Sequence, residues 1–254
     1  MSTNTMELAW HDLQFILRRT PSKLLSQLQK NPGRTFLAGG AIRSIIAGEP
    51  VNDFDLFVSS KDEAKALANA LAKDQDRALN EHGLLPGIHE TDNAFTMTQY
   101  KPSVQIIHRW TFDDPRKCIE SFDFTVAQAA VWWEQVGDTA GKWVSCASSR
   151  FYMDLCAKRL IYTAPTRDEE PGGSMLRVLK FYQRGYRIPL DSLSRVMARL
   201  CKTVDFDAIS RATDKEDQLA KVLCGLLREV DPNVDPDHIS HLPSETETPQ
   251  EEQP

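Results

Sequence analysis

The chain has 254 residues, of which 41% are hydrophobic and 26% charged, and its formal net charge is −6. These values are typical of a globular protein with one large domain, or with a catalytic domain and a smaller companion. No apolar run approaches the roughly 20 residues that span a bilayer. Residues 1–5 lack the basic start of a signal peptide. We therefore expect a cytoplasmic protein with no membrane partner.

The negative charge is concentrated at the C-terminal end. Residues 231–254 hold seven acidic residues, five prolines and no Lys or Arg. Such a segment buries too little apolar surface to offset its ordering entropy, so we predict a disordered tail. Removing these seven charges from −6 leaves +1 for residues 1–230. Partners of the folded part must therefore be inferred from local charge clusters.

The first half of the chain alternates between helix and strand patterns. Apolar residues at helical spacing predict a helix over 6–30, interrupted at Pro21. A short apolar strand at 35–38 ends at Gly39-Gly40, and a helix follows until Gly48. The composition then predicts a strand at 51–58, a helix at 61–82, strands at 94–100 and 104–110, a short helix at 114–119, and strands at 122–131 and near 143–144.

Beyond residue 150 the pattern becomes helical, with helices predicted at 150–160, 175–185, 192–202 and 216–230. The order of elements predicts an α+β catalytic domain over 1–148, a small all-helical domain over 149–230, and the tail over 231–254. The five cysteines form no Cys-x-x-Cys pair and predict buried free thiols: Cys118, Cys146, Cys156, Cys201 and Cys224.

Two carboxylates stand one residue apart in the segment 53–58. In a strand, residues i and i+2 point to the same face, so Asp53 and Asp55 project together while Phe54 packs on the other side. Two carboxylates held this close repel each other unless a cation lies between them. A divalent ion such as Mg²⁺ takes oxygen ligands of this kind. Most Asp-x-Asp pairs are exposed surface pairs, so the neighbouring segments must add support.

Gly39-Gly40 adds that support, because it lies between a predicted strand and a predicted helix. Without Cβ atoms the backbone can approach a ligand closely, and the free N–H groups of a helix start favour an anion such as a triphosphate. Arg43, one turn into the helix, can bind phosphate oxygens. The alternative is an ordinary turn with a surface arginine.

Asp123 completes the set of candidate catalytic residues. It stands among large apolar residues in the segment 121–126, where an unpaired carboxylate would be costly to bury. A neighbouring strand can direct it to the metal held by Asp53 and Asp55. Two-metal phosphoryl transfer needs carboxylates that hold both ions. The alternative is a structural Asp that caps a turn.

Residues 36–48 followed by Asp53-Phe54-Asp55 resemble the class II tRNA nucleotidyltransferase and bacterial poly(A) polymerase family, which has Gly-Gly-x-Val-Arg-Asp, a small helix and Asp-x-Asp. The segment 123–126 is similar to its Asp-Phe-Thr-Ile strand. The segments 154–160 and 175–186 are similar to its linker and neck helix. The similarity covers about 35–190 in the family's order.

The resemblance implies a polymerase-β-like head with a mixed, roughly five-stranded sheet and flanking helices, followed by a helical neck. It also implies two Mg²⁺ ions, with Mn²⁺ as an alternative, and transfer of a nucleoside monophosphate from ATP or CTP. Asp53, Asp55 and Asp123 are then catalytic residues and metal ligands. Gly39, Gly40 and Arg43 are nucleotide-binding residues on this interpretation.

The chain departs from the family at several positions. The Asp that follows the first Arg in the family is Ser44 here, and the Arg pair before Asp123 is replaced by Ser121 and Phe122. The base-reading Glu-Asp-x-x-Arg stretch corresponds to residues 170–174, which keep only the Glu. We also expect the family's long C-terminal region, which grips tRNA, to be absent. The base and the acceptor therefore stay open.

A basic cluster in the neck suggests one acceptor. Residues 174–202 hold seven basic residues and one acidic residue. Arg177 and Lys180 share one helix face, so we predict that they bind nucleotide and that the neck helices contact an RNA backbone. The alternative is a solvated helix face. The acceptor is then an RNA 3′ end. Alternatives are transfer to a protein or small molecule, or a non-catalytic nucleotide- or RNA-binding module.

Overall fold

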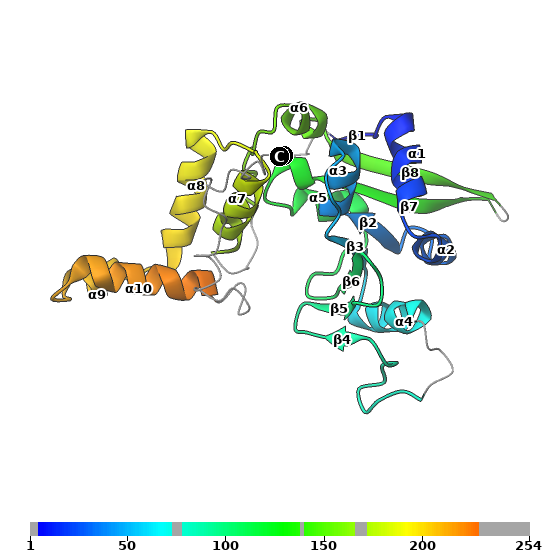
Figure 1. The fold of residues 1–254 in the computed structure, drawn as a ribbon, viewed down its shortest axis with the longest axis horizontal. Coiled ribbons are helices and arrows are strands. Elements are labelled where there is room, and N and C mark those ends of the chain that lie inside the picture. The colour runs from blue at the N-terminus through cyan, green and yellow to red at the C-terminus, as the bar shows by residue number, and fades with distance from the viewer. Residues whose placement is uncertain (1–4, 73–77, 138–139, 166–171, 229–254) are drawn as a thin grey trace, which may run out of the picture. The chain divides into compact units, whose positions relative to one another are not determined.

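The computed structural model describes residues 5–72, 78–137, 140–165 and 172–228 (Figure 1). The predicted tail, 231–254, lies outside the described residues. The chain forms two compact units, one of Met1–Arg167 with Tyr186–Ser192 and the other of Asp168–Gly185 with Leu193–Pro254. The first unit includes residues 149–167, which the sequence pattern assigns to the neck. Within the described ranges, no helix has the length and apolar character to cross a membrane.

The first unit is built on one sheet of eight strands in the order β1-β8-β7-β2-β3-β6-β5-β4. β3 and β6 are parallel, and the other neighbours are antiparallel. The predicted α+β class is confirmed. The sheet is larger than the expected five strands, partly because two-residue strands such as β1 and β4 are too short to show alternation. The strands are β1 (Thr5–Met6), β2 (Thr35–Ala38), β3 (Asp53–Val58), β4 (His89–Glu90), β5 (Ala94–Met97), β6 (Ser103–Ile107), β7 (Ala129–Val136) and β8 (Ala140–Ser148).

Helices cover both faces of this sheet. α3 and α4 contact β3, α1 packs on α3, and α2 packs on α4 (Figure 1). α5 packs on β2, β7 and β8. The helices of the first unit are α1 (Trp10–Arg19), α2 (Ser22–Lys30), α3 (Gly40–Ala47), α4 (Lys61–Leu71), α5 (Pro115–Glu120), η1 (Thr125–Ala127) and α6 (Phe151–Cys156).

The second unit is helical in its described part. It contains α7 (Gly173–Gln183), η2 (Cys201–Thr203), α9 (Phe206–Ser210) and α10 (Lys215–Arg228). α8 (Leu190–Leu200) begins in the first unit and continues in the second. α7 and α10 pack together, and the backbone of α10 approaches Gly172 so closely that a Cβ there would lie 2.4 Å from the carbonyl oxygen of Leu226.

Side-chain caps and turn residues set several helix ends. Pro21 separates α1 from α2, as the sequence predicts. The hydroxyl of Ser60 accepts a hydrogen bond from the N–H of Glu63 and starts α4. The predicted helix over 61–82 is too long, because α4 ends at Leu71 and residues 78–82 are not helical. There the side chain of Asn80 accepts hydrogen bonds from the N–H groups of His82 and Leu84, a local turn that competes with helix.

Two further predictions of secondary structure are wrong in part. The strand predicted at 122–131 begins only at Ala129, and η1 precedes it. The apolar residues before Ala129 are buried within a tight turn and do not form a β-ladder. The helix predicted at 150–160 ends at Cys156, and Lys158 adopts a φ of 46° that ends helical structure.

The sheet face under α5 holds an aromatic and aliphatic core. Phe36 and Phe57 stack with ring centroids 5.8 Å apart. Because strand residues alternate between faces, Leu37 and Leu56 lie on the opposite face, toward α3 and α4. The buried cluster on the α5 face consists of Phe36, Ala38, Phe57, Cys118, Ile119, Ala130, Trp132 and Cys146.

The cysteines are free, but they are not all buried. Cys118 and Cys146 lie in the core, where burial raises the pKa of the Cys146 thiol to about 12. Cys156 and Cys224 are exposed and Cys201 is half-buried, so the prediction of five buried thiols is wrong for these three. Cys156 and Cys224 stand on helices that bury only one side, α6 and α10. The spacing of cysteines in the sequence does not show whether a thiol lies on the buried or the exposed side.

His108 gives the first unit a pH-dependent stability. Its imidazole is 7% exposed and packs against the ring of Phe95. Desolvation, reinforced by the charge of Lys61, lowers the pKa of His108 from its ordinary value of 6.5. The unfolded chain therefore binds a proton more readily than the folded chain. Stability from this group is present above pH 6.5 and is lost as the pH falls below it.

We expect the urea midpoint of the wild type to fall from pH 7.5 to pH 5.5. The drop should be smaller in His108→Gln, which has no imidazole to protonate. Urea titrations of both proteins at pH 7.5, 6.5 and 5.5 measure this. Equal drops in the two proteins contradict the assignment, whatever the absolute stability of the variant.

Candidate active site

Gly39 makes the turn between β2 and α3. Its φ is 86° and its ψ is −133°, a conformation that residues with a Cβ rarely adopt. Its N–H donates a hydrogen bond of 2.9 Å to the carbonyl of Ala129 on β7. The ring of Phe122 lies 3.6 Å from the place that a Cβ would occupy. The chain can therefore turn here, close to Phe122, because residue 39 is glycine.

Arg43 lies against the start of α3. Both terminal nitrogens of its guanidinium are 3.8 Å from the place of a Cβ at Gly40. Its Nη2 donates a 2.8 Å hydrogen bond to the hydroxyl of Ser44, and the residue is only 5% exposed. The structure thus brings Arg43 next to the free N–H groups at the helix N-terminus. These groups together suit an anion.

Asp53 and Asp55 lie on β3, and their side chains point to the same face of the sheet as that of Phe57. Both are half-buried, whereas Phe54 on the other face is 2% exposed. Leu37 on β2 pairs with Leu56, so the turn after β2 lies beside the start of β3. The structure therefore places the two carboxylates and the Gly39-Gly40 turn on neighbouring strands, at the same end.

Polar residues that sequence analysis missed extend the surface around these carboxylates. Asp53 pairs with Ser103 and Asp55 with Gln105 across the parallel β3–β6 ladder, and Gln105 pairs with Thr96 on β5. All three of these polar residues are half-buried and share the carboxylates' face. The alternation of Ser103 and Gln105 with apolar neighbours was the available signal. A polar surface thus spans three strands, next to the aromatic rings of the α5 face.

Asp123 lies in a bend and not on a strand. It is 3% exposed and follows Phe122, whose ring is 5.7 Å from that of Phe57. The hydroxyl of Thr163 donates to the carbonyl of Phe122, and the N–H of Thr163 donates to the carbonyl of Asp123. The backbone at Asp123 is therefore held firmly beside the aromatic rings, while its catalytic role stays a prediction.

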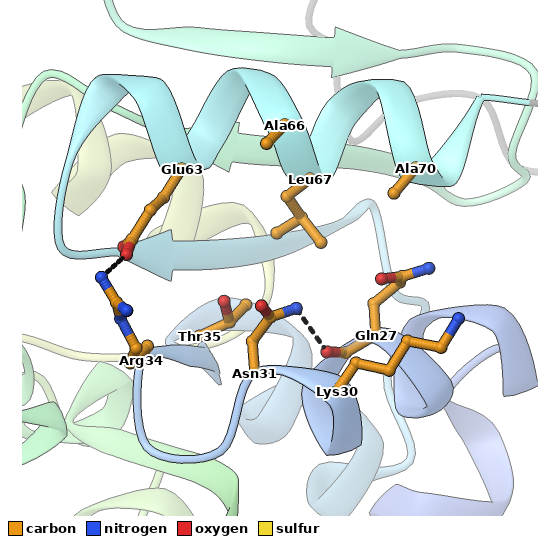
Figure 2. Close-up of a pocket in the computed structure, with 9 residues that line it drawn as sticks. All are labelled: Gln27, Lys30, Asn31, Arg34, Thr35, Glu63, Ala66, Leu67 and Ala70. Carbon is orange, nitrogen blue, oxygen red and sulfur yellow. Dashed lines mark hydrogen bonds and ion pairs between the residues drawn. The ribbon is translucent and has the colours of Figure 1, made fainter.

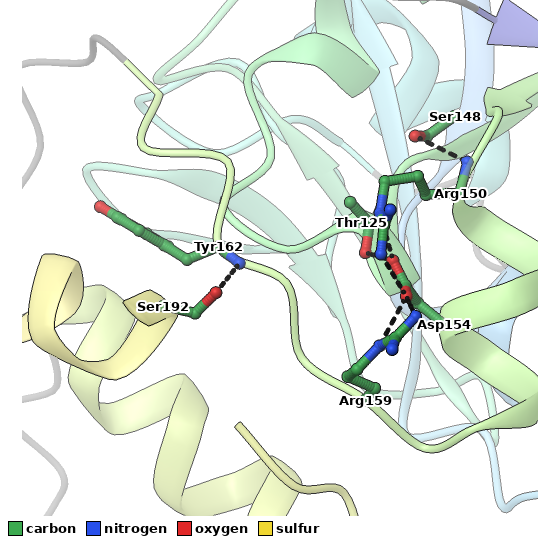
Figure 3. Close-up of polar contacts among 7 residues, drawn as sticks. All are labelled: Thr125, Ser148, Arg150, Asp154, Arg159, Tyr162 and Ser192. Atoms are coloured by element: carbon green, nitrogen blue, oxygen red, sulfur yellow. Dashed lines mark hydrogen bonds and ion pairs between the residues drawn. The ribbon is translucent and has the colours of Figure 1, made fainter. Parts of the chain in front are cut away.

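Asp154 holds the turn that follows Asp123. It is fully buried, and its carboxylate accepts five hydrogen bonds of 2.7–3.1 Å (Figure 3). They come from the hydroxyl of Thr125 and from two guanidinium groups, those of Arg150 and Arg159. Thr125 belongs to η1, directly after Asp123 and Phe124. Asp154 therefore stabilises the turn that carries Asp123 through its hydrogen bond with Thr125. The sequence pattern did not indicate this role.

A divalent metal ion fits the chemistry of the Asp53 and Asp55 pair. The pair offers carboxylate oxygens, the ligands that Mg²⁺ prefers, and it is partly open to solvent. Among the described residues, no three His, Cys, Asp or Glu side chains are grouped so that they would hold a metal ion. Mg²⁺ commonly takes water and substrate oxygens as further ligands. Asp123 as a third ligand, and the metal itself, stay predictions.

The two predicted nucleotide-binding residues of the neck lie in the second unit. Arg177 is half-buried and Lys180 exposed, and both belong to α7. Their part in nucleotide binding stays a prediction of the sequence.

A separate pocket of about 280 Å³ lies between α2 and α4 (Figure 2). Its apolar lining residues, Ala66, Leu67 and Ala70, come from α4, and Arg34 and Glu63 form an ion pair at one side. None of the predicted site residues lines it. Its lining residues are Gln27, Lys30, Asn31, Arg34, Thr35, Glu63, Ala66, Leu67 and Ala70.

Solved structures share this fold. A CCA-adding enzyme of Thermotoga maritima, complexed with tRNA, is 14% identical with a TM-score of 0.51, over 92% of this chain and 57% of the enzyme. A CCA-adding enzyme in complex with CTP is 16% identical with a TM-score of 0.52, over 93% of this chain and 52% of the enzyme. This chain thus spans little more than half the length of either enzyme. At such identities the likeness establishes the fold.

No curated protein matches the sequence. A family model does match it over residues 11–158, which is more than half of the chain and includes Gly39, Arg43, Asp53, Asp55 and Asp123. Its description is Gabija anti-defense 2 family protein. This chain belongs to the Gabija anti-defense 2 family.

Proposed function

We propose that this chain is a metal-dependent nucleotidyltransferase that moves a nucleoside monophosphate from a nucleoside triphosphate to an acceptor hydroxyl. One observation carries the proposal: Asp53 and Asp55 share a face of β3 beside the Gly39-Gly40 turn and Arg43. The fold is that of CCA-adding enzymes, one of which has been solved with CTP. ATP and CTP are therefore the first substrates to test.

Each group has a distinct task in this proposal. The N-terminus of α3 and Arg43 bind the triphosphate. Asp53 and Asp55 hold Mg²⁺, with Mn²⁺ as an alternative, and the ion supplies stabilisation of the negative charge on the phosphates. The acceptor oxygen attacks the α-phosphorus, the bond to the bridging oxygen breaks, and pyrophosphate leaves. In this proposal Asp123 would lie near the attacking oxygen, and its carboxylate would accept the proton that the acceptor hydroxyl loses.

We propose an RNA 3′ end as the acceptor. The Thermotoga maritima enzyme is complexed with tRNA, and the basic residues of α7 and α8 suit a phosphate backbone. The resemblance covers only 57% of that enzyme, so its substrate is not carried over whole. The family description names an anti-defense role against Gabija. We propose that nucleotidyl transfer is the chemistry of that role.

The experiment follows the label. The purified protein is incubated with Mg²⁺, each α-labelled nucleoside triphosphate in turn, and separate pools of cellular RNA, protein and small metabolites. Label in RNA that is lost after ribonuclease treatment supports the proposal in full. Label in protein or metabolites supports the transfer and replaces the acceptor. If no pool gains label above a control treated with a metal chelator, the transferase proposal is wrong.

A further inference from the structure

Glu49 is a nearly buried carboxylate between two cations. Its Oε2 lies 3.8 Å from Nε of Arg43, and its Oε1 lies 3.7 Å from Nζ of Lys158. The side chain is 14% exposed, and within the described residues neither oxygen accepts a hydrogen bond. Burying a carboxylate in this way is costly unless its charge is compensated. Glu49 therefore links Arg43 electrostatically to Lys158.

The end of α3 explains why Glu49 lies there. Gly48 has a φ of 68°, its N–H donates to the carbonyl of Ile45, and the N–H of Glu49 donates to the carbonyl of Ser44 at 2.8 Å. These paired bonds turn the chain back along the helix. Ser44 stands where the resembling tRNA nucleotidyltransferases have Asp, and its hydroxyl accepts from Arg43. Glu49 thus places a negative charge beside Arg43.

Lys158 is held in an unusual conformation beside this pair. Its φ is 46°, which is rare for a residue with a side chain. Its N–H donates to the carbonyl of Leu155, and its carbonyl accepts from the N–H of Arg187 at 2.8 Å. Its ammonium lies 5.7 Å from the ring centre of Tyr186, and its side chain is 51% exposed. A strained backbone that directs an accessible charge toward a site is typical of a functional position.

We propose that Lys158 is a second phosphate-binding cation of this site and that Glu49 positions it next to Arg43. Arg43, Glu49 and Lys158 form a row in which charged atoms of each residue lie within 4 Å of the next. The guanidinium end of this row lies beside the start of α3 at Gly40. The anion that fits such a row is the polyphosphate of a nucleoside triphosphate. This inference rests on the proposed nucleotidyl transfer, but its test uses binding alone.

Binding of inorganic tripolyphosphate in the presence of Mg²⁺ tests the role of Lys158 in the full chain. Calorimetry should show that Lys158→Gln weakens binding about tenfold, the effect of one lost charge-assisted contact. Lys158→Gly should weaken it as much, and its Tm should fall less than that of Lys158→Gln, because glycine adopts the left-handed φ without strain. Lys158→Arg should retain most of the affinity. The matched control is Lys142→Gln, an exposed lysine on β8, which should bind as the wild type does.

A double-mutant cycle tests the positioning role of Glu49. Glu49→Gln should weaken tripolyphosphate binding in the wild type and have a clearly smaller effect in the Lys158→Gln background. A residue with a merely structural role gives equal effects in both backgrounds. Circular dichroism and Tm show that each variant is folded before its affinity is compared.

The proposal is overturned if the wild type does not bind tripolyphosphate, if Lys158→Gln binds it with unchanged affinity, or if the effects of Glu49→Gln and Lys158→Gln are additive. Its failure is distinguishable from failure of the transferase proposal, since label transfer can persist in Lys158→Gln with an unchanged KM. Conversely, if tripolyphosphate binding depends on Lys158 but no label is transferred, the phosphate-binding proposal stands and the nucleotidyl transfer proposal is wrong.

Discussion

Asp55→Asn is expected to lower the rate of nucleotidyl transfer by at least about a thousandfold, and Asp53→Asn to do the same. Asparagine keeps the shape of the side chain but removes the charge that holds a divalent ion against the triphosphate. Both residues are half-buried on β3 and share one face, so each variant leaves the other carboxylate without its companion. Initial rates of label transfer under saturating Mg²⁺ measure the effect.

The stability of these variants separates a catalytic effect from a folding effect. Asparagine has nearly the shape of aspartate, so Asp55→Asn should keep a cooperative thermal transition in a chelator. Asp92→Asn, an exposed residue of the same unit, is the matched control and should retain the wild-type rate. If a variant of Asp53 or Asp55 keeps more than a tenth of the wild-type rate, the catalytic role of this pair is wrong.

Asp154→Ala is expected to destabilise the first unit by about 3 kcal/mol or more. The substitution leaves the guanidinium groups of Arg150 and Arg159 without the carboxylate that accepts four of their hydrogen bonds, and it frees the hydroxyl of Thr125. Asp154 is fully buried, while the two arginine side chains are 43% and 38% exposed. Water can therefore solvate the arginines in part, which keeps the loss near the lower end of the range for broken buried pairs. Urea denaturation measures the loss.

An exposed ion pair of the same unit provides the comparison. Glu134 lies 3.8 Å from Lys142 across the β7–β8 hairpin, and both side chains are about half exposed or more. Glu134→Ala should change the free energy of unfolding by less than about 1 kcal/mol, as is usual for surface pairs. If Asp154→Ala costs no more than Glu134→Ala, the buried network contributes little. Because Thr125 follows Asp123 closely, we also expect lower transfer activity in Asp154→Ala at temperatures where it stays folded.

The local residues of the site were accessible from the sequence. Gly39-Gly40 predicts a turn that needs a backbone without Cβ atoms, and the structure has φ 86° at Gly39. The i and i+2 spacing of Asp53 and Asp55 predicts one shared face, and their half-burial beside the fully buried Leu56 agrees with it. These features depend on neighbours within a few residues. Local stereochemistry and strand alternation are enough to predict them.

The contacts between the site and distant segments of the chain could not be predicted from the sequence in the same way. The apolar residues that flank Asp123 predict a strand, but they are buried in a tight turn that Thr163 and the Asp154 network hold in place. Apolar runs show that a segment is buried and do not show which partner buries it.

By itself, the sequence determined the α+β class, the turn before α3, and the pairing of Asp53 with Asp55, since each follows from chain-local geometry. Only the tertiary structure decided that Gln105 lies beside Asp55 and that Lys158 reaches Arg43 through Glu49. Strand register joins Gln105 to Asp55, 50 positions away, and side-chain packing joins Lys158 to Glu49, 109 positions away. Both follow from packing of the whole sheet against its helices. A single sequence does not encode such partners at any fixed spacing.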